Sequence, residues 1–261
     1  MPRSSPSPRT PASRSWDAVA EWYLGWSGTH GSLHHRRTAI PLLLDLLIAQ
    51  PGERVLDLGC GPGVLAPHLA RRRCSLVGVD RSRRLIDAAR RAHRGLGRFH
   101  VGDVTALESL QALGQEPFDA ATFLLSIQDI DPLAAVLHGV RARLTDKGRI
   151  VIVMIHPCFR VPRQSGWGWD AQRQLQYRRV DRYLTPLTVP MRTTPDGRTA
   201  TRSYHRPLEQ YVSLLAEAGF VIDALRETPS EPVTRGSHSQ VQRRAEAEFP
   251  LFLGLRARRA P

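Results

Sequence analysis

VLDLGCGPG, residues 55–63, joins a short apolar run to three glycines that occupy every second position. Residues 55–58 have the composition of a buried parallel strand, and residues 64–70 read as the start of a helix. Gly59 and Gly61 permit backbone angles and a close approach that a Cβ atom would forbid. A ligand can therefore lie against the main chain, where the N–H groups of a helix N-terminus point outward.

The residues around this turn indicate which ligand it holds. The dinucleotide fingerprint G-x-G-x-x-G/A is matched only weakly. Asp57 precedes the first glycine, and the apolar run 75–79 ends at Asp80, whose carboxylate can accept both ribose hydroxyls of an adenosine. Asp103 follows a third predicted strand, in a position to reach an adenine amino group. These acids favour an adenosine-containing cofactor.

Four segments in this order, VLDLGCGPG, VGVD (77–80), VGDV (101–104) and FDAATFLLSIQDI (118–130), resemble the motif set of class I S-adenosylmethionine-dependent methyltransferases of the bacterial small-molecule type. The resemblance covers residues 16–261 and implies S-adenosyl-L-methionine as the cofactor. It implies that the glycines hold the methionine part, Asp80 the ribose and Asp103 the adenine. The cofactor-binding residues expected on this basis are Tyr23, Asp57, Gly59, Cys60, Gly61, Gly63, Asp80, Arg81, Asp103, Val104 and Leu125.

Alternating strand and helix patterns run from residue 53 to residue 154 and predict a parallel sheet covered on both faces. Ligands then bind beyond the carboxyl ends of the strands. Two last strands, near 221–225 and 249–255, are expected to close the sheet as an antiparallel hairpin, as in the family. The predicted fold is α/β, a doubly wound, mostly parallel, seven-stranded Rossmann-like sheet. The expected strands are 53–57, 75–79, 97–101, 118–124 and 148–154, and the expected helices are 62–71, 82–92, 106–112 and 132–144.

Composition predicts one globular unit after a disordered tail at residues 1–15, which is rich in proline, serine and arginine. Hydrophobic residues make up 41% of the 261-residue chain, and no apolar run is long enough to span a bilayer. We expect a cytoplasmic protein without a membrane partner. The expected parts of residues 16–261 are an N-terminal helical cap (16–50), a cofactor-binding core (51–155), an acceptor-side insert after the fifth strand (156–206), and a final helix and strands (207–261).

The cap contains WDAVAEWYLGW (16–26) and GSLHHR (31–36), which resemble the N-terminal segment of many bacterial small-molecule methyltransferases. In those relatives the segment folds over the cofactor, which would place Tyr23, Ser32 and His35 near the active site. Trp16 and Trp22 are expected to pack in the core. The three cysteines contain no C-x-x-C pair, so we expect neither a metal site nor a disulfide framework.

The insert combines ten arginines and three aspartates with Trp167 and Trp169. Arginine can hold a carboxylate or phosphate in bidentate fashion, and aromatic side chains can hold a flat body. The sequence therefore predicts that Arg160, Arg163 and Trp167 contact an anionic or aromatic acceptor. Solvated surface arginines are the alternative.

Methyl transfer from a sulfonium is an in-line displacement, so a general base is optional. His156 follows the fifth strand and is the expected catalytic base, although an imidazole there could instead cap backbone groups. Gln128 and Asp129 follow the fourth strand, where the N/D-P-P-aromatic motif of enzymes that methylate DNA-base amines is absent. The expected substrate-binding residues are His35, Gln128, Asp129, Arg160, Arg163 and Trp167.

The predicted function is methyl transfer to an O or N atom of a small anionic or aromatic metabolite, by a monomer or homodimer. The net charge of +13, carried almost entirely by arginine, leaves an alternative open. In that alternative the enzyme modifies RNA and its arginines bind phosphates.

Overall fold

The computed structural model describes residues 15–193, 199–229 and 240–260. Apart from Ser15, the tail predicted at residues 1–15 lies outside the described residues. A seven-stranded sheet organises the chain, in the order β10-β11-β5-β4-β1-β2-β3. In this spatial order, each adjacent pair of strands from β5 to β3 is parallel, whereas β11 runs antiparallel to both β5 and β10. This is the predicted doubly wound, mostly parallel fold.

The strands of this sheet are β1 (Arg54–Leu58), β2 (Ser75–Asp80), β3 (Arg98–Val101), β4 (Phe118–Leu124), β5 (Leu144–Ile155), β10 (Phe220–Pro229) and β11 (Pro250–Arg259). The helices are α1 (Ser15–Ser27), α2 (Ile40–Leu47), α3 (Ala66–Arg71), α4 (Arg83–Ala92), α5 (Leu133–Arg143), α6 (Leu208–Glu217) and α7 (Gln240–Glu248). A π-helical segment, η2 (His35–Ala39), precedes α2, and 3₁₀ turns occupy η3 (Val104–Ser109), η4 (Gln111–Leu113) and η5 (Ile127–Asp129).

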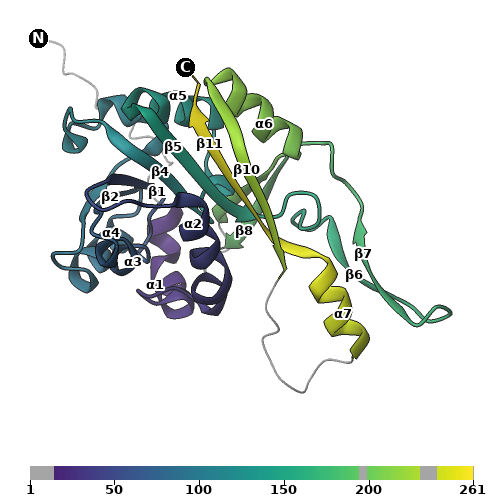
Figure 1. Ribbon diagram of the computed structural model, residues 1–261. Coiled ribbons are helices and arrows are strands. Elements are labelled where there is room, and N and C mark those ends of the chain that lie inside the picture. The colour runs from purple at the N-terminus through teal and green to yellow at the C-terminus, as the bar shows by residue number, and fades with distance from the viewer. Residues whose placement is uncertain (1–14, 194–198, 230–239, 261) are drawn as a thin grey trace, which may run out of the picture.

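Two hydrophobic cores lie on opposite faces of the sheet, because successive strand residues point to opposite sides. Ile150, Ile152 and Met154 belong to the core that includes α5 and α6. Val151 and Val153 belong to the core that includes α2 and α3. Figure 1 shows α1 to α4 gathered on one side of the sheet and α5 and α6 on the other. Both faces are therefore covered, as the near-continuous apolar strands predict.

Several element boundaries differ from the sequence predictions. The helix expected from residue 62 begins at Ala66, because Gly63 has a left-handed φ of 78° that belongs to the preceding turn. The helix expected at 106–112 is replaced by η3 and η4, with a non-helical Ala106 (φ −131°) interrupting the segment. The fifth strand begins earlier than predicted, at Leu144.

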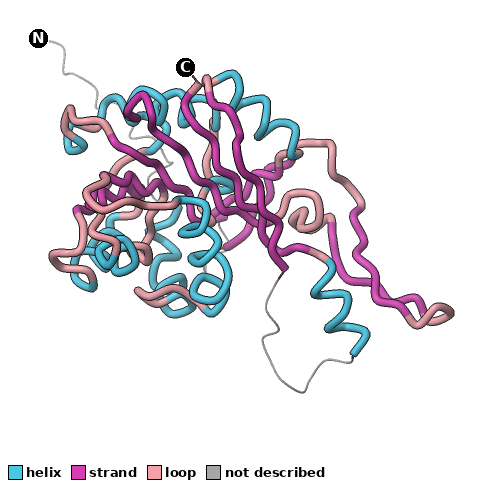
Figure 2. Tube along the Cα trace, in the orientation of Figure 1, coloured by secondary structure: helices cyan, strands magenta, loops and turns pink. Residues whose placement is uncertain are grey.

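The insert after β5 is also more regular than its turn-rich sequence indicates. It forms two antiparallel hairpins, one of β6 (Ser165–Asp170) and β7 (Leu175–Val180), and one of β8 (Leu187–Thr193) and β9 (Thr199–His205). The β6–β7 hairpin extends away from the sheet next to α7 (Figure 2). The β9 strand instead contacts α1 and η5. Only one of the two hairpins is therefore placed beside the cap.

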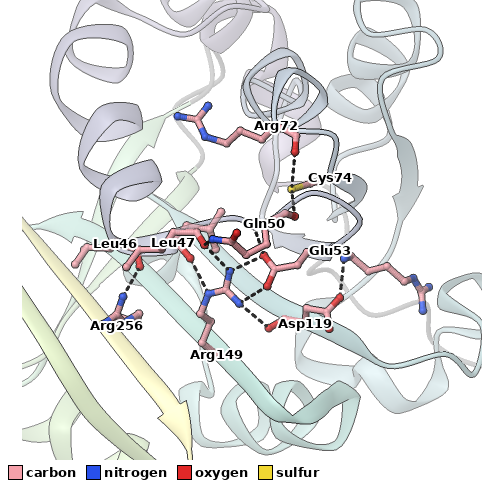
Figure 3. A network of polar contacts seen from close by, with 11 residues as sticks. Leu46, Leu47, Gln50, Glu53, Arg72, Cys74, Asp119, Arg149 and Arg256 are labelled. Carbon is pink, nitrogen blue, oxygen red and sulfur yellow. Dashed lines mark hydrogen bonds and ion pairs between the residues drawn. The ribbon is translucent and has the colours of Figure 1, made fainter.

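A polar network holds the amino-terminal edge of the sheet to α2 (Figure 3). Arg149 of β5 is 7% exposed, and its Nη1 and Nη2 donate to the two carboxylate oxygens of Glu53 at 2.8 and 2.6 Å. Its Nε donates at 2.7 Å to the carbonyl oxygen of Leu47, which is the last residue of α2. The Arg256 guanidinium reaches the neighbouring Leu46 carbonyl at 3.2 Å. Two arginine side chains thus donate to carbonyls in the last turn of α2, which have no partner within the helix.

Among the described residues, no helix combines the length and the apolar character needed to cross a bilayer.

Candidate active site

A cavity of about 410 Å³ lies at the carboxyl ends of β1, β2 and β4. Helix α1 and the β8–β9 hairpin supply its other walls. This is the edge at which ligands bind in doubly wound sheets. Eleven of the predicted site residues line it: Tyr23, His35, Gly59, Gly61, Asp80, Arg81, Asp103, Val104, Leu125, Gln128 and Asp129.

The glycine turn is fixed to the neighbouring strand and leaves open space above it. The N–H groups of Gly59 and Cys60 both donate to the Val79 carbonyl, at 2.8 and 3.1 Å. Gly61 has a φ of 52°, and a Cβ added there would meet only Tyr23 within 4 Å, at 3.8 Å. The glycine therefore keeps the main chain accessible from the cavity, as a cofactor lying against it requires.

Asp80, at the end of β2, is 9% exposed and lines the cavity. Its two carboxylate oxygens accept hydrogen bonds from the backbone N–H groups of Gly61 and Ser82, each at 2.8 Å. Burial raises the pKa of Asp80, and these two hydrogen bonds oppose the shift. The acid expected to hold the ribose thus also anchors the glycine turn.

Asp103 carries a second set of fixed contacts on the same wall. Its Oδ1 accepts from the backbone N–H and the hydroxyl of Thr105, at 3.0 and 2.7 Å, and its Oδ2 accepts from the Arg81 guanidinium. Burial would raise its pKa, but these contacts together hold the pKa below the ordinary value. Asp103 therefore stays ionised and oriented toward the space beside Val104.

Aromatic side chains of the cap form the wall opposite the glycine turn. Trp16 and Trp22 both line the cavity, and Trp22 is 44% exposed, so the expectation that they pack in the core is wrong. The reason lies in α1 itself, where Val19 and Ala20 fill the core face. Trp22 stacks on Trp26 with 7° between the rings and 6.4 Å between their centroids.

Tyr23 and His35 complete this wall and are both uncharged near neutral pH. Burial, chiefly, raises the pKa of Tyr23 to about 12. Burial and the neighbouring His34 lower the pKa of His35 to about 4. The His35 Nδ1 lies 2.9 Å from the Ser32 hydroxyl, and its ring meets Trp26 edge-on at 5.8 Å. The cap therefore offers a flat, neutral, aromatic surface.

The acceptor side of the cavity is formed by η5 and the β8–β9 hairpin. Burial raises the pKa of Asp129 to about 7, and a hydrogen bond from Ser203 opposes this shift. The Gln128 amide donates from Nε2 to the Leu125 carbonyl at 2.6 Å. Asp131 accepts from the buried Arg206 guanidinium at 2.7 Å. Amide and carboxyl oxygens therefore dominate this end.

The structure does not place His156 at the cavity, which corrects the expectation that it faces the acceptor. The residue is 1% exposed and absent from the cavity lining. Its Nε2 lies 2.7 Å from a Glu227 carboxylate oxygen, and its Nδ1 accepts from the Cys158 backbone N–H at 3.2 Å. Both ring nitrogens have a hydrogen-bond partner, so His156 joins the end of β5 to β10. Its contact with the Cys158 N–H agrees with the alternative in which the imidazole caps backbone groups.

Arg160, Arg163 and Trp167 also lie away from the cavity lining. The Arg163 guanidinium is exposed and donates to the Pro190 carbonyl at 2.8 Å. The Trp167 ring packs edge-on against Phe249 at 5.5 Å, with the Arg178 guanidinium over it at 5.2 Å. Arg163 therefore contacts β8 and Trp167 contacts Phe249, and none of the three residues lines the cavity.

Three further predicted cofactor residues lie behind the turn rather than in the cavity lining. Asp57 is 2% exposed and accepts from the Thr122 hydroxyl at 2.9 Å. Cys60 packs toward Gly78, where an added Cβ would come within 2.8 Å of its sulfur. A Cβ on Gly63 would lie 2.8 Å from the Phe99 ring. Their role in the structure is packing around the turn.

Most residues of the acceptor wall were not predicted from the sequence. The missed lining residues include Trp26, Ser126, Ile130, Asp131, Ile155, Met191, Thr201, Ser203 and Tyr204. A signal was available for Ser126, because it follows β4 directly. In the β8–β9 hairpin, Thr201 and Ser203 are both buried and lie two residues apart, which is the spacing of side chains on one face of a strand. This spacing could have predicted a strand with one inward face.

The fold and the cavity define an α/β protein with a nucleoside-type ligand site at the carboxyl edge of its sheet. A family model described as a methyltransferase domain matches residues 32–225, so the chain belongs to the methyltransferase domain family.

Curated relatives match part of the chain. A ubiquinone biosynthesis O-methyltransferase of Xylella fastidiosa is 29% identical over 143 residues, which are 54% of this chain and 58% of the relative. A demethylmenaquinone methyltransferase of Beutenbergia cavernae is 29% identical over 154 residues, which are 59% of this chain and 58% of the relative. The chain thus spans less than two thirds of the length of these relatives.

Solved structures share the fold over more of the chain. An S-adenosylmethionine-dependent methyltransferase from Mesorhizobium loti has a TM-score of 0.64 at 23% identity and covers 84% of this chain and 96% of its own. A putative one from Listeria monocytogenes has a TM-score of 0.66 at 23% identity and covers 86% of this chain and 100% of its own.

Proposed function

We propose that this chain is an S-adenosylmethionine-dependent methyltransferase that acts on an O or N atom of a small molecule with a flat, apolar part. One observation carries the proposal. A single cavity brings together an accessible glycine turn, two oriented carboxylates and an aromatic wall. The glycine turn and the two carboxylates suit an adenosine-containing cofactor, and the aromatic wall suits a flat acceptor.

The residues present fit the cofactor. Gly61 leaves a cradle that a side chain would occupy, Asp80 would hold the ribose hydroxyls and Asp103 the adenine amino group. When bound, the cofactor supplies a methyl group already activated on a positively charged sulfur. In this proposal residues 16–50 act as a cap that excludes water, and residues 51–155 supply the cofactor contacts.

Two observations favour a small molecule over RNA. The only arginine in the cavity lining, Arg81, is paired with Asp103, so the lining of the described residues offers no free cation for a phosphate. The names of two relatives refer to ubiquinone biosynthesis and demethylmenaquinone, and that of one structural neighbour refers to 1,6-didemethyltoxoflavin. All three concern small molecules. The other arginines of the described residues lie outside the cavity lining.

The test is transfer of a tritiated methyl group from S-adenosylmethionine to a bacterial extract that is then separated into metabolites, RNA and protein. We expect label in the metabolite fraction, and we expect the variant Asp80→Ala to transfer far less. The expected transfer should also change little with salt, since phosphate-driven binding weakens steeply as salt rises. Label confined to RNA, or no label above the background without protein, would contradict the proposal.

A further inference from the structure

Four carboxylates line the cavity, and three of them have a strong partner. Asp80 accepts from two backbone N–H groups, Asp103 is paired with Arg81, and Asp131 is paired with the 4%-exposed Arg206. Asp129 differs. Within the part of the chain that the structure describes, no cationic side chain forms an ion pair with it. The nearby Ser203 hydroxyl lowers its pKa and donates to the neighbouring Gln128 carbonyl at 3.4 Å. A carboxylate without a cation in a partly closed cavity favours a cationic or proton-donating ligand.

The groups around Asp129 do not supply the missing cation. Tyr23 of α1 and Tyr211 of α6 lie nearby, and the pKa of both phenols is raised chiefly by burial, to which the negative charge of Asp129 adds. Arg206, just before α6, is held by Asp131 and the Ile130 carbonyl, at 2.7 and 2.9 Å. Burial accordingly raises the pKa of Asp129 to about 7, which suits a group that exchanges a proton near neutral pH.

A side-chain oxygen next to Asp129 lacks a hydrogen-bond donor among the described residues. The Gln128 Oε1 is buried and has no hydrogen-bond partner among the described residues. The orientation of this amide is fixed, because its Nε2 donates to the Leu125 carbonyl at 2.6 Å. A buried acceptor without a donor is costly, so a ligand that brings N–H groups would satisfy it.

The aromatic wall has the same preference. Trp22, Tyr23, Trp26 and Tyr204 line the cavity, and aromatic faces carry negative electrostatic potential that attracts cations. Tyr204 already has one cation at its ring, since the Arg206 guanidinium lies 5.3 Å from the centroid. Among the described lining residues, an anionic acceptor would meet carboxylates and aromatic faces, and the one lining arginine, Arg81, is already paired with Asp103.

We propose, on the basis of the function proposed above, that the methyl acceptor is a nitrogen base, an amine or nitrogen heterocycle on a flat apolar body, whose nitrogen faces Asp129 and Gln128. In the reaction the acceptor N–H bond breaks and its proton passes to the Asp129 carboxylate. The nitrogen lone pair forms the new N–CH₃ bond, and the electron pair of the S–CH₃ bond stays on the sulfur. Asp129 is then a catalytic residue.

The test compares three probes with one aromatic body: tryptamine, indole-3-ethanol and indole-3-propionate. Each is titrated calorimetrically into protein saturated with S-adenosylhomocysteine. We expect tryptamine to bind at least about tenfold more tightly than indole-3-ethanol, and indole-3-propionate to bind most weakly. Asp129→Asn should remove the preference, and Asp129→Glu should retain part of it. The control Asp87→Asn, at a half-buried residue of α4 outside the cavity lining, should leave it unchanged.

The S-adenosylhomocysteine titration of each variant, done first, separates this inference from the proposed function. If the parent does not bind S-adenosylhomocysteine, the function itself is contradicted. If the parent binds it but tryptamine binds no better than indole-3-propionate, or not at all, only the nitrogen-base inference is overturned. An unchanged tryptamine preference in Asp129→Asn would also overturn the role of Asp129, since normal S-adenosylhomocysteine binding would show that the variant is folded.

Discussion

The Asp80 carboxylate accepts a hydrogen bond from the backbone N–H of Gly61 at 2.8 Å, across the gap between β2 and the glycine turn. One side chain therefore has two tasks, since it shapes the turn and faces the space where a ribose would lie. Loss of its charge should therefore lower cofactor affinity in two ways: by removing a direct contact with the ribose, and by weakening the bond that holds the turn.

We expect Asp80→Asn to weaken S-adenosylhomocysteine binding by about 10- to 150-fold, because hydrogen bonds to a charged group contribute about 1.5–3 kcal/mol. Tryptophan fluorescence can follow the titration, because Trp16, Trp22 and Trp26 all line the cavity. Asp87→Asn is the matched control and should behave as the parent. Equal affinity in the two variants would show that Asp80 does not contact the cofactor.

The glycine turn allows a test that separates strain from ligand contact. Gly61 and Gly52 both have positive φ, 52° and 91°, and a Cβ added to Gly52 meets nothing within 4 Å. Alanine at either position should cost about 1–2 kcal/mol of stability. Only Gly61→Ala should also weaken S-adenosylhomocysteine binding, by at least about tenfold, because its Cβ enters the cradle. Thermal unfolding and calorimetry measure the two effects, and similar affinities would place the cofactor elsewhere.

The pKa of Asp129 predicts a pH profile. Burial raises this pKa to about 7. As pH falls below about 7, a growing fraction of Asp129 is protonated and cannot accept the proton of the acceptor. Methyl transfer to tryptamine or another accepted amine should therefore decline by about tenfold per pH unit on the acid side. In Asp129→Asn the rate should be low and this inflection absent. An inflection that persists in the variant would assign it to another group.

The buried network around Arg149 predicts a stability effect without a catalytic one. Removing one partner of a buried ion pair costs about 3–5 kcal/mol, so Arg149→Ala should lower the melting temperature by roughly 6–20 °C. Arg258→Ala, which removes an exposed arginine paired with Asp223, should cost about 1 kcal/mol or less. Thermal unfolding followed by circular dichroism compares the two, and equal losses would show that the network contributes no more than a surface pair.

This network should also make stability depend on pH. Burial would raise the pKa of Glu53, but hydrogen bonds from Arg149 and from the Gln50 backbone hold it below the ordinary 4.5. A lowered carboxyl pKa stabilises the folded protein fully above the unfolded value, and this contribution is lost as pH falls through the folded value. The difference in melting temperature between the parent and Arg149→Ala should therefore shrink as pH falls below about 4.5. A constant difference would contradict the ion-pair account.

The sheet and its cofactor edge were predictable because both are encoded locally. Buried parallel strands are apolar throughout. The polar residues Asp80, Asp103 and Gln128 lie at the end of a strand or within four residues after it, so their convergence needs only the topology. The direction of a side chain at a strand end is not encoded in this way. His156 follows β5 as expected, yet it turns to Glu227 on β10, a partner 71 positions further along the chain.

The acceptor wall was harder to predict for a related reason. Helical periodicity places Trp22 and Trp26 on one face of α1, four residues apart, but does not reveal whether that face meets the core or a cavity. In the insert, arginine and tryptophan content indicated a ligand surface. The structure instead places Met191, Thr201, Ser203 and Tyr204 of the second hairpin at the cavity, and these residues form no recognisable motif.

The most direct test of the central claim is a calorimetric titration of the full chain with S-adenosylhomocysteine, with NAD as the comparison ligand. Binding at a single site with low-micromolar affinity, accompanied by a change in tryptophan fluorescence and no binding of NAD, is the predicted result. The fluorescence change is expected because the cap tryptophans line the same cavity as Asp80 and Gly61. Absence of S-adenosylhomocysteine binding, or binding of NAD in its place, would contradict the assignment of this cavity.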